Sequence, residues 1–174
     1  MIKAYIDTNI VVARYKPDDP LHDVAEKLFN FPQTELYASP LTLVELYSVL
    51  SRVHIETSLT GIRKMSLHSL ISFIVKDCRL KLILRSHFSR RMVTSYEVHA
   101  PLEYHLAIEL SEQLKLRTLD LLHVAYTSIL KRAKITDTLI TGDEEVLESR
   151  EQILNSAEVQ VRHPRDVIMG VQKT

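Results

Sequence analysis

Short apolar runs alternate with longer stretches of helical periodicity along this chain. The first run begins at Ala4 and ends in an acid, a hydroxyl and an amide, at Asp7, Thr8 and Asn9. Strand interiors favour apolar, β-branched and aromatic residues and are depleted of Asp and Asn. We therefore predict a first strand with Asp7 at its carboxyl end, which is the edge where ligands bind in open parallel α/β sheets.

Apolar residues at positions 21, 24, 25, 28 and 29 indicate an amphipathic helix over Leu21–Phe31. Further helices are predicted over Asn9–Tyr15, Leu41–Val53, Thr60–Lys76, Pro101–Leu116, Thr118–Ala133 and Glu144–Leu154. Further strands are predicted over Leu36–Ala38, Val93–His99, Asp137–Thr141 and Glu158–Val161. Between them, Arg79–Arg91 alternates leucines with basic residues and fits either a strand or part of a helical hairpin. Strands that alternate with helices predict a parallel sheet covered on both faces.

Length and composition bound the class of protein. The chain has 174 residues, 45% hydrophobic and 25% charged, which predicts one soluble globular domain over 1–174. Its single cysteine, Cys78, allows no intramolecular disulfide and favours a reducing cytoplasm. Because Asp7 falls where the apolar part of a signal peptide would lie, we expect no signal peptide at the start of this sequence. The longest uncharged run, Met65–Val75, is too short to span a membrane, so we expect no membrane contact.

Charge is distributed unevenly, although the formal net charge is zero. Between Thr57 and Tyr96 the only acid is Asp77 against eight bases, so that segment carries +7 and the remainder −7. This pattern is typical of a polyanion contact, and a solvated helical face with long Lys and Arg stems is the alternative. We interpret 57–98 as a basic helical insertion or extension. The residues expected to bind the polyanion are Arg63, Lys64, Arg79, Lys81, Arg85, Arg90 and Arg91.

Three further acids fall at the starts of predicted helices or the ends of predicted strands. Glu45 stands about two turns into a helix for which Ser39 is the predicted N-cap. Asp120 falls in the first turn after Thr118, its predicted N-cap. Asp143 follows a strand, as Asp7 does. Taken singly, each has a structural explanation: an exposed Glu on a polar stripe, an acid favoured by the helix dipole, or a helix cap.

The residues around Asp143 and Asp120 leave alternatives open. Thr141 and Glu144 fit a capping box, and Glu144 is also a possible extra ligand. His123 lies three residues after Asp120, and a lone His is more often packed or hydrogen-bonded than a ligand, so we leave it out of the site.

Together the four acids predict a metal site. Carboxylates gathered without cations are costly, because like charges close together cannot all stay ionised. The sequence offers no cation spaced to neutralise them. Mg²⁺ or Mn²⁺ relieves that cost and prefers oxygen ligands. No Cys or paired His spacing indicates zinc.

Four segments of the sequence resemble the PIN-domain ribonucleases, and in particular the VapC-type toxins. These segments are Ile6–Asn9, Ser39–Leu46, Leu119–Ala125 and Leu139–Asp143, and their order runs through nearly the whole chain. The resemblance implies a three-layer α/β/α sandwich with a central, mainly parallel sheet. The chain is somewhat long for a compact toxin of this kind, with the surplus around Cys78–Val98.

Carried over to this chain, the resemblance implies that Asp7, Glu45, Asp120 and Asp143 are catalytic and bind Mg²⁺ or Mn²⁺. Their polar supports would be Thr8, Asn9 and Thr141. The implied activity is metal-dependent hydrolysis of RNA phosphodiester bonds by the cytoplasmic toxin of a toxin–antitoxin pair. The implied partners are an RNA substrate, a small antitoxin and a second copy in a homodimer.

Three other functions fit parts of the pattern. An RNA-processing PIN nuclease without an antitoxin needs the same acids. A non-catalytic PIN-like module would bind RNA or protein without cleavage, but the presence of all four acids speaks against it. An unrelated α/β phosphatase would use Asp7 as a nucleophile, and such enzymes usually have a second acid at the position of Asn9.

Overall fold

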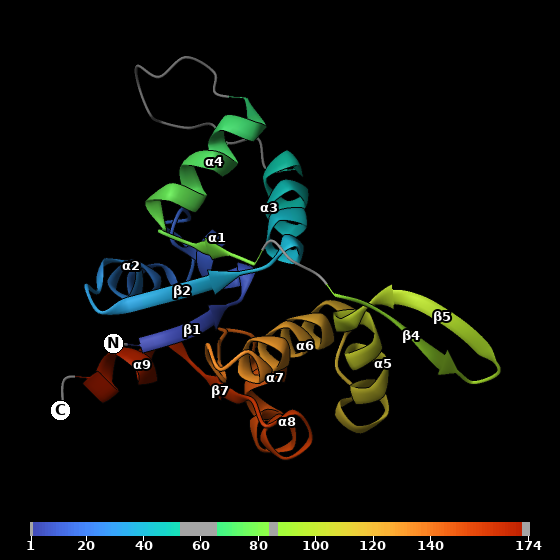
Figure 1. Cartoon of the computed structure of the whole chain (residues 1–174). Helices are drawn as coiled ribbons and strands as arrows, with labels where there is room; N and C mark the ends of the chain where they lie inside the picture. Colours follow the sequence, from blue (N-terminus) through green and yellow to red (C-terminus); the bar gives the residue numbers. More distant parts are fainter. Residues whose placement is uncertain (1, 53–65, 84–86, 172–174) are drawn as a thin grey trace.

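The computed structural model describes residues 2–52, 66–83 and 87–171, and its elements are drawn in Figure 1. Five parallel strands form the main sheet in the order β3-β2-β1-β6-β7. The strands are β1 (Ile2–Ile6), β2 (Thr34–Ala38), β3 (Lys81–Leu82), β6 (Thr138–Ile140) and β7 (Gln160–Arg162). The chain runs outward from β1 to β3, returns, and continues on the other side through β6 and β7, so the strand order reverses between β1 and β6.

Helices cover both faces of this sheet, which confirms the predicted three-layer α/β/α sandwich with a parallel sheet. One layer holds α1 (Thr8–Ala13), α2 (His22–Asn30), α3 (Pro40–Arg52), α4 (Leu67–Asp77) and α9 (Pro164–Val171). The other holds α5 (Leu102–Leu114), α6 (Thr118–Arg132), α7 (Glu144–Glu148) and α8 (Arg150–Ala157).

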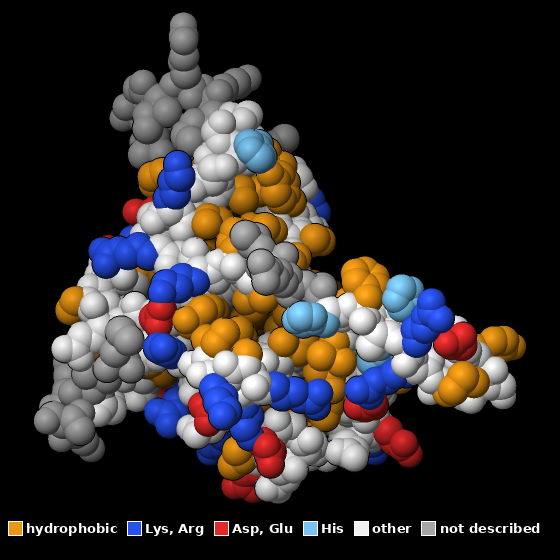
Figure 2. All heavy atoms as spheres, viewed as in Figure 1, with side chains coloured by type: hydrophobic (Ala, Val, Ile, Leu, Met, Phe, Trp, Pro, Cys, Tyr) orange, Lys and Arg blue, Asp and Glu red, His pale blue; other side chains and the backbone are white. Residues whose placement is uncertain are grey.

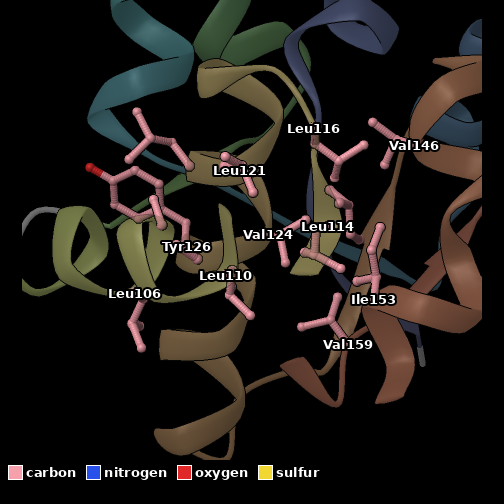
Figure 3. Packing of buried hydrophobic residues seen from close by; sticks show 14 of the residues in the cluster. Leu106, Leu110, Leu114, Leu116, Leu121, Val124, Tyr126, Val146, Ile153 and Val159 are labelled. Atoms are coloured by element: carbon pink, nitrogen blue, oxygen red, sulfur yellow. The ribbon is translucent and has the colours of Figure 1, made fainter. Parts of the chain in front are cut away.

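The alternation of side chains along β1 explains the two layers. Ala4 and Ile6 point to the first layer and Tyr5 to the second, as period-2 alternation requires. All three are fully buried, because a strand inside a parallel sheet is covered on both sides. Figure 3 shows the second core, in which side chains of α5, α6 and α8 gather, among them Leu110, Val124 and Ile153.

Most predicted elements are found within a few residues of their expected limits. The strand over Ala4–Asn9 is β1, with Asp7 directly after its last residue. Ser39 caps α3 as predicted, because its Oγ accepts from the Thr42 backbone N–H at 3.5 Å. The first part of the helix predicted over Thr60–Lys76 lies outside the described residues, and its remainder is α4.

The ambiguous segment Arg79–Arg91 forms strands where it is described. Lys81 and Leu82 form β3, and from Phe88 the chain enters an antiparallel ribbon of β4 (Phe88–Val93) and β5 (Tyr96–Pro101). The strand predicted over Val93–His99 is confirmed from Tyr96 onward as part of β5, but a turn at Thr94, with φ of 57°, separates this part from Val93, the last residue of β4. Figure 1 shows this ribbon extending away from the sheet beside α5.

Two boundary predictions near the carboxyl half are wrong, and one helix there was not expected. The helix predicted over Glu144–Leu154 is two helices that meet at Ser149, the C-cap of α7 and N-cap of α8. Arg117, not Thr118, is the N-cap of α6, and no side chain caps that helix. Helix α9 was not predicted, although Pro164 suits a first helical position.

The segment interpreted as a basic helical insertion, 57–98, is helical only at α4 among its described residues. The rest of its described part holds β3 and most of the ribbon. No helix in the described part of the chain is long and apolar enough to cross a membrane.

Candidate metal centre at the sheet edge

The predicted acids gather where the strand order reverses, at the carboxyl edge of β1 and β6. Asp7 follows β1, and its backbone N–H donates to the Ile140 carbonyl at 2.9 Å, extending the pairing of the two strands. Asp143 follows β6 as the N-cap of α7. Glu45 comes from α3 and Asp120 from the first turn of α6. In open α/β sheets this reversal point is the usual ligand site.

Asp7 is held by a network of polar side chains. Its Oδ2 accepts from Thr141 Oγ1 at 2.7 Å and from Asn9 Nδ2 at 3.0 Å. Thr141 also accepts from the Asp143 backbone N–H at 3.0 Å, so one hydroxyl links two of the acids. The carboxylate is also the N-cap of α1, because Oδ1 accepts from the Asn9 backbone N–H at 3.3 Å. Thr141 and Asn9 thus lie where polar supports were predicted.

Glu45 is fixed by two donors from different elements. Its Oε2 accepts from Thr8 Oγ1 at 2.5 Å and from His123 Nε2 at 2.9 Å. The same His123 nitrogen lies 3.5 Å from Asp7 Oδ1. Burial opposes ionisation of Glu45, but the hydrogen bond and charge of His123 and the Thr8 hydroxyl outweigh it and lower the pKa of the carboxyl.

His123 is buried in the core, and its surroundings are polar on both ring nitrogens. Its Nδ1 lies 2.9 Å from the Tyr5 hydroxyl, which also contacts Ser39 Oγ at 2.7 Å. Burial lowers the pKa of the imidazole, but the charges of Asp7 and Glu45 raise it further than burial lowers it, so the net shift is upward. The prediction that His123 is hydrogen-bonded is confirmed. The sequence expectation of no cation spaced to neutralise the acids did not consider His123, whose ring nitrogen contacts Glu45 and lies near Asp7.

Asp120 has the opposite environment. Its carboxyl is half-buried and makes no hydrogen bond or ion pair with the residues that the structure describes. Burial first, and then the charges of Asp143 and Asp7, raise its pKa to about 6. The nearby charges of His123 and Arg117 only partly offset this shift. Burial and the like charges of Asp143 and Asp7 therefore dominate at Asp120.

Asp143, a predicted metal ligand, is also the N-cap of helix α7. Its Oδ1 accepts from the backbone N–H groups of Glu145 at 2.9 Å and Val146 at 3.2 Å, so it caps α7. The capping box predicted from Thr141 and Glu144 is wrong, because the Thr141 hydroxyl is turned toward Asp7 instead. Glu144 is exposed at the first position of α7, and its role as an extra ligand stays a prediction.

The donor set fits a hard divalent cation by its chemistry. All four acids offer oxygen, as Mg²⁺ and Mn²⁺ prefer, and the repulsion around Asp120 is the kind that a cation removes. As the side chains lie, no group of three or more His, Cys, Asp or Glu within 2–52, 66–83 and 87–171 is placed to hold a metal ion. The fit of this site to Mg²⁺ or Mn²⁺ therefore rests on its oxygen donors and on the repulsion around Asp120, and not on a preformed arrangement of ligands.

The basic residues predicted to bind a polyanion do not form one surface in the described part. Arg63, Lys64 and Arg85 lie outside the described residues. Lys81 forms an ion pair with Glu35, and Arg91 of β4 forms one with Glu109 of α5. Arg79 and Arg90 are exposed and make no ion pair with described residues. Figure 2 shows Lys and Arg scattered over this face among acids and apolar side chains.

Comparison with known proteins assigns the family. Residues 4–151 match the family model described as PIN domain. The chain belongs to the PIN domain family. PIN domains are generally nucleases and generally use divalent metal ions, which supports hydrolase activity for this member.

A solved structure resembles this PIN domain over nearly its full length. It is the crystal structure of VapBC2 from Rickettsia felis bound to a DNA fragment from their promoter, with a TM-score of 0.54 and 15% sequence identity. The likeness covers 93% of this chain and 98% of that chain, and at this identity it shows the shared fold. No curated protein matches the chain.

Sequence reasoning missed one contributor to the candidate centre of this PIN domain. Tyr5 lies inside the first apolar run, where an aromatic residue is expected in any buried strand. Its hydroxyl nevertheless lies within the polar network of the site. The signal for this role is weak in the sequence, because only the fold shows that Tyr5 faces α6.

Proposed function

We propose that this PIN domain is a metal-dependent endoribonuclease and the toxin of a toxin–antitoxin pair. The observation that carries the proposal is the meeting of Asp7, Glu45, Asp120 and Asp143 at the reversal point of the sheet, with the pKa of Asp120 raised by its acidic neighbours. Family membership supports nuclease activity. RNA as the substrate and the identity of the metal, Mg²⁺ or Mn²⁺, are part of the proposal.

The chain's own residues would hold and orient the reacting groups. Asp7, Glu45, Asp120 and Asp143 would hold Mg²⁺ or Mn²⁺. Thr141 and Asn9 keep the Asp7 carboxylate in one orientation, and the Thr8 hydroxyl does the same for Glu45. When bound, such an ion supplies a water of lowered pKa and neutralises charge on the phosphate oxygens.

The substrate we favour is single-stranded RNA, since its backbone adapts more easily than a duplex to acids placed at the edge of a sheet. Exposed Lys and Arg side chains would contact the RNA phosphates and would make the affinity for RNA depend on salt concentration. Within the described residues, Arg79 and Arg90 are available for that contact, whereas Lys81 and Arg91 are paired with acids.

Cleavage of labelled single-stranded RNA in the presence of Mn²⁺ tests the activity. We expect Asp7→Asn and Asp120→Asn each to lower the rate by at least about 100-fold, because each removes a charged ligand. Asp137→Asn is the matched control: this Asp stands before β6 at the opposite edge of the sheet, where it accepts from Gln160. Equal cleavage by the wild type and both site variants would overturn the assignment.

The toxin assignment needs a separate experiment, because a housekeeping nuclease has the same acids. The VapBC2 structure is a complex, and its likeness to this chain supports a small antitoxin as partner. We expect expression of the wild type to arrest bacterial growth, expression of Asp7→Asn to leave growth unchanged, and the product of an adjacent small reading frame to restore it. Normal growth with an active wild-type nuclease would favour the RNA-processing function.

The proposed homodimer is tested by sedimentation of the purified protein. A single species at the mass of one 20.1 kDa chain, across the working concentration range, would contradict it.

A further inference from the structure

Two buried residues behind the acids carry an inference beyond the carboxylates themselves. Tyr5 belongs to β1 and is fully buried, and His123 belongs to α6 and is 2% exposed. The Tyr5 hydroxyl lies 2.9 Å from His123 Nδ1, and His123 Nε2 lies 2.9 Å from Glu45 Oε2. A continuous polar chain thus runs from the sheet through the imidazole to an acid of the site.

The hydrogen-bond roles in this chain are fixed by what each atom can donate. An ionised carboxylate only accepts, so His123 Nε2 must carry the proton that it shares with Glu45. In the neutral ring Nδ1 then accepts from the Tyr5 hydroxyl, and in the charged ring Nδ1 donates to it while the hydroxyl turns to Ser39. Both protonation states keep the same donor directed at Glu45, so the arrangement does not depend on titration.

The chain of hydrogen bonds also joins the two helical layers. Glu45 comes from α3, which packs in one core, whereas His123 comes from α6 on the opposite face of the sheet. Tyr5 lies on the strand between them, and its ring stacks on Tyr126 with centroids 6.2 Å apart. His123 therefore links Glu45 to Asp7, because its Nε2 contacts Glu45 and lies 3.5 Å from Asp7 Oδ1. Thr8 supplies the second donor to Glu45.

We propose that Tyr5 and His123 are positioning residues that hold the Glu45 carboxylate beside Asp7, so that both carboxylates can serve one metal ion. This inference rests on the proposed function, because it assigns Glu45 and Asp7 to a metal centre. Neither residue would touch the substrate, since both side chains are buried and their polar atoms are engaged with Glu45, Ser39 and each other. Replacing a residue that orients a metal ligand in this way typically lowers metal affinity roughly 10- to 100-fold.

Calorimetric titration with Mn²⁺ separates positioning from general stability. We expect Tyr5→Phe to weaken Mn²⁺ binding about 10-fold and His123→Leu about 100-fold. His123→Gln, whose amide nitrogen can reach the place of Nε2, is expected to recover most of the loss. Tyr126→Phe is the matched control: it removes a buried phenol hydroxyl, which donates to Glu103 at 2.9 Å, from the ring stacked on Tyr5.

A second measurement uses the nuclease reaction. A positioning role raises the Mn²⁺ concentration for half-maximal cleavage in Tyr5→Phe and leaves the rate at saturating Mn²⁺ close to that of the wild type. Unchanged Mn²⁺ affinity in folded Tyr5→Phe and His123→Leu, with a wild type that binds and cleaves, would overturn this inference alone. A wild type that neither binds Mn²⁺ nor cleaves RNA would instead overturn the proposed function and, with it, this inference.

Discussion

The Asp120 carboxyl faces Asp7 and Asp143, and its environment makes the stability of the protein depend on pH. In the folded, metal-free protein its pKa is about 6, against an ordinary value of 3.8. Between these values the folded state binds more protons than the unfolded chain, so stability falls as the pH rises and the loss is complete above about pH 6.

Asp120→Asn is therefore expected to stabilise the metal-free protein at neutral pH. The carboxyl is only half-buried, so solvent screening reduces the gain to about 1 kcal/mol in the free energy of unfolding. Urea unfolding with a chelator, at intervals from pH 4 to 7, measures it. We expect the variant to show a flatter pH dependence, and identical profiles for the two proteins would contradict the assigned environment.

Thr141→Val tests the hydroxyl that links Asp7 to Asp143. The change keeps the shape of the side chain but removes a donor to Asp7 and an acceptor for the Asp143 N–H. Leaving these groups unpaired costs roughly 1–3 kcal/mol, and Mn²⁺ binding should weaken as well.

Thr136→Val is the control for that change. Its hydroxyl donates to the Lys3 carbonyl and accepts from the Thr138 N–H, with the same pattern at the opposite edge of the sheet. We expect a similar loss of stability without any change in Mn²⁺ affinity. An equal effect of both variants on Mn²⁺ binding would remove Thr141 from the site.

How far the site follows from sequence differs from residue to residue. Asp7 and Asp143 are predictable because polar residues directly after apolar runs mark the ends of strands, and parallel strands end at one edge. The contribution of Tyr5 is not, since a buried strand and a polar network both accept a tyrosine. The contact of His123 with Glu45 depends on how α6 is placed relative to α3, which periodicity does not specify.

At the scale of elements, Asp143 is the N-cap of helix α7 and a proposed metal ligand, and two substitutions distinguish these roles. Asp143→Asn keeps a good N-cap but loses the charge, whereas Asp143→Ala loses both. We expect Asn to be nearly neutral for stability and Ala to cost about 0.5–2 kcal/mol, with Mn²⁺ binding weakened in both. Chemical unfolding and calorimetry check the two quantities. Mn²⁺ affinity that falls only in the Ala variant would mean that Asp143 acts as a cap alone.

The ribbon of β4 and β5 offers a matched pair of arginines for testing the RNA contact. Arg90 is exposed and unpaired among the described residues, while its neighbour Arg91 is paired with Glu109. We expect Arg90→Ala to weaken binding of single-stranded RNA and to reduce the slope of log affinity against log salt by about 0.7. Arg91→Ala should change both quantities less. Fluorescence anisotropy over a salt series measures both the affinity and its salt dependence. An equal response of the two variants would contradict a role for Arg90 in RNA contact.

The elements that sequence reasoning missed have local causes. In Arg79–Arg91, leucines at every second position suit a short strand as well as a helix. Further along, the turn at Thr94 that separates β4 from β5 contains no Gly or Asn to mark it. The division between α7 and α8 at Ser149 interrupts a stretch without Pro or Gly, so composition does not reveal it.

At the scale of the whole molecule, metal binding should be coupled to folding. A ligand that binds only the folded state stabilises it by about 2.7 kcal/mol at 100 times its Kd. We expect Mn²⁺ to raise the Tm of the wild type relative to chelator, and the rise to be lost in Asp7→Asn. Scanning calorimetry measures this, with Asp137→Asn expected to keep the full rise. A rise of equal size in Asp7→Asn would place the ion elsewhere.

The reversal of strand order also determines when, during synthesis, the proposed site can form. The Asp7 carboxylate is made first, whereas its partner Thr141 and the acid Asp143 lie on the far side of β6 and leave the ribosome late. A nascent chain that stops before β6 can pair β1 with β2, but it lacks β6 and the residues Thr141 and Asp143 that follow it. On the proposed function, the complete set of four acids would therefore exist only after Asp143, late in the 174-residue chain, has been made.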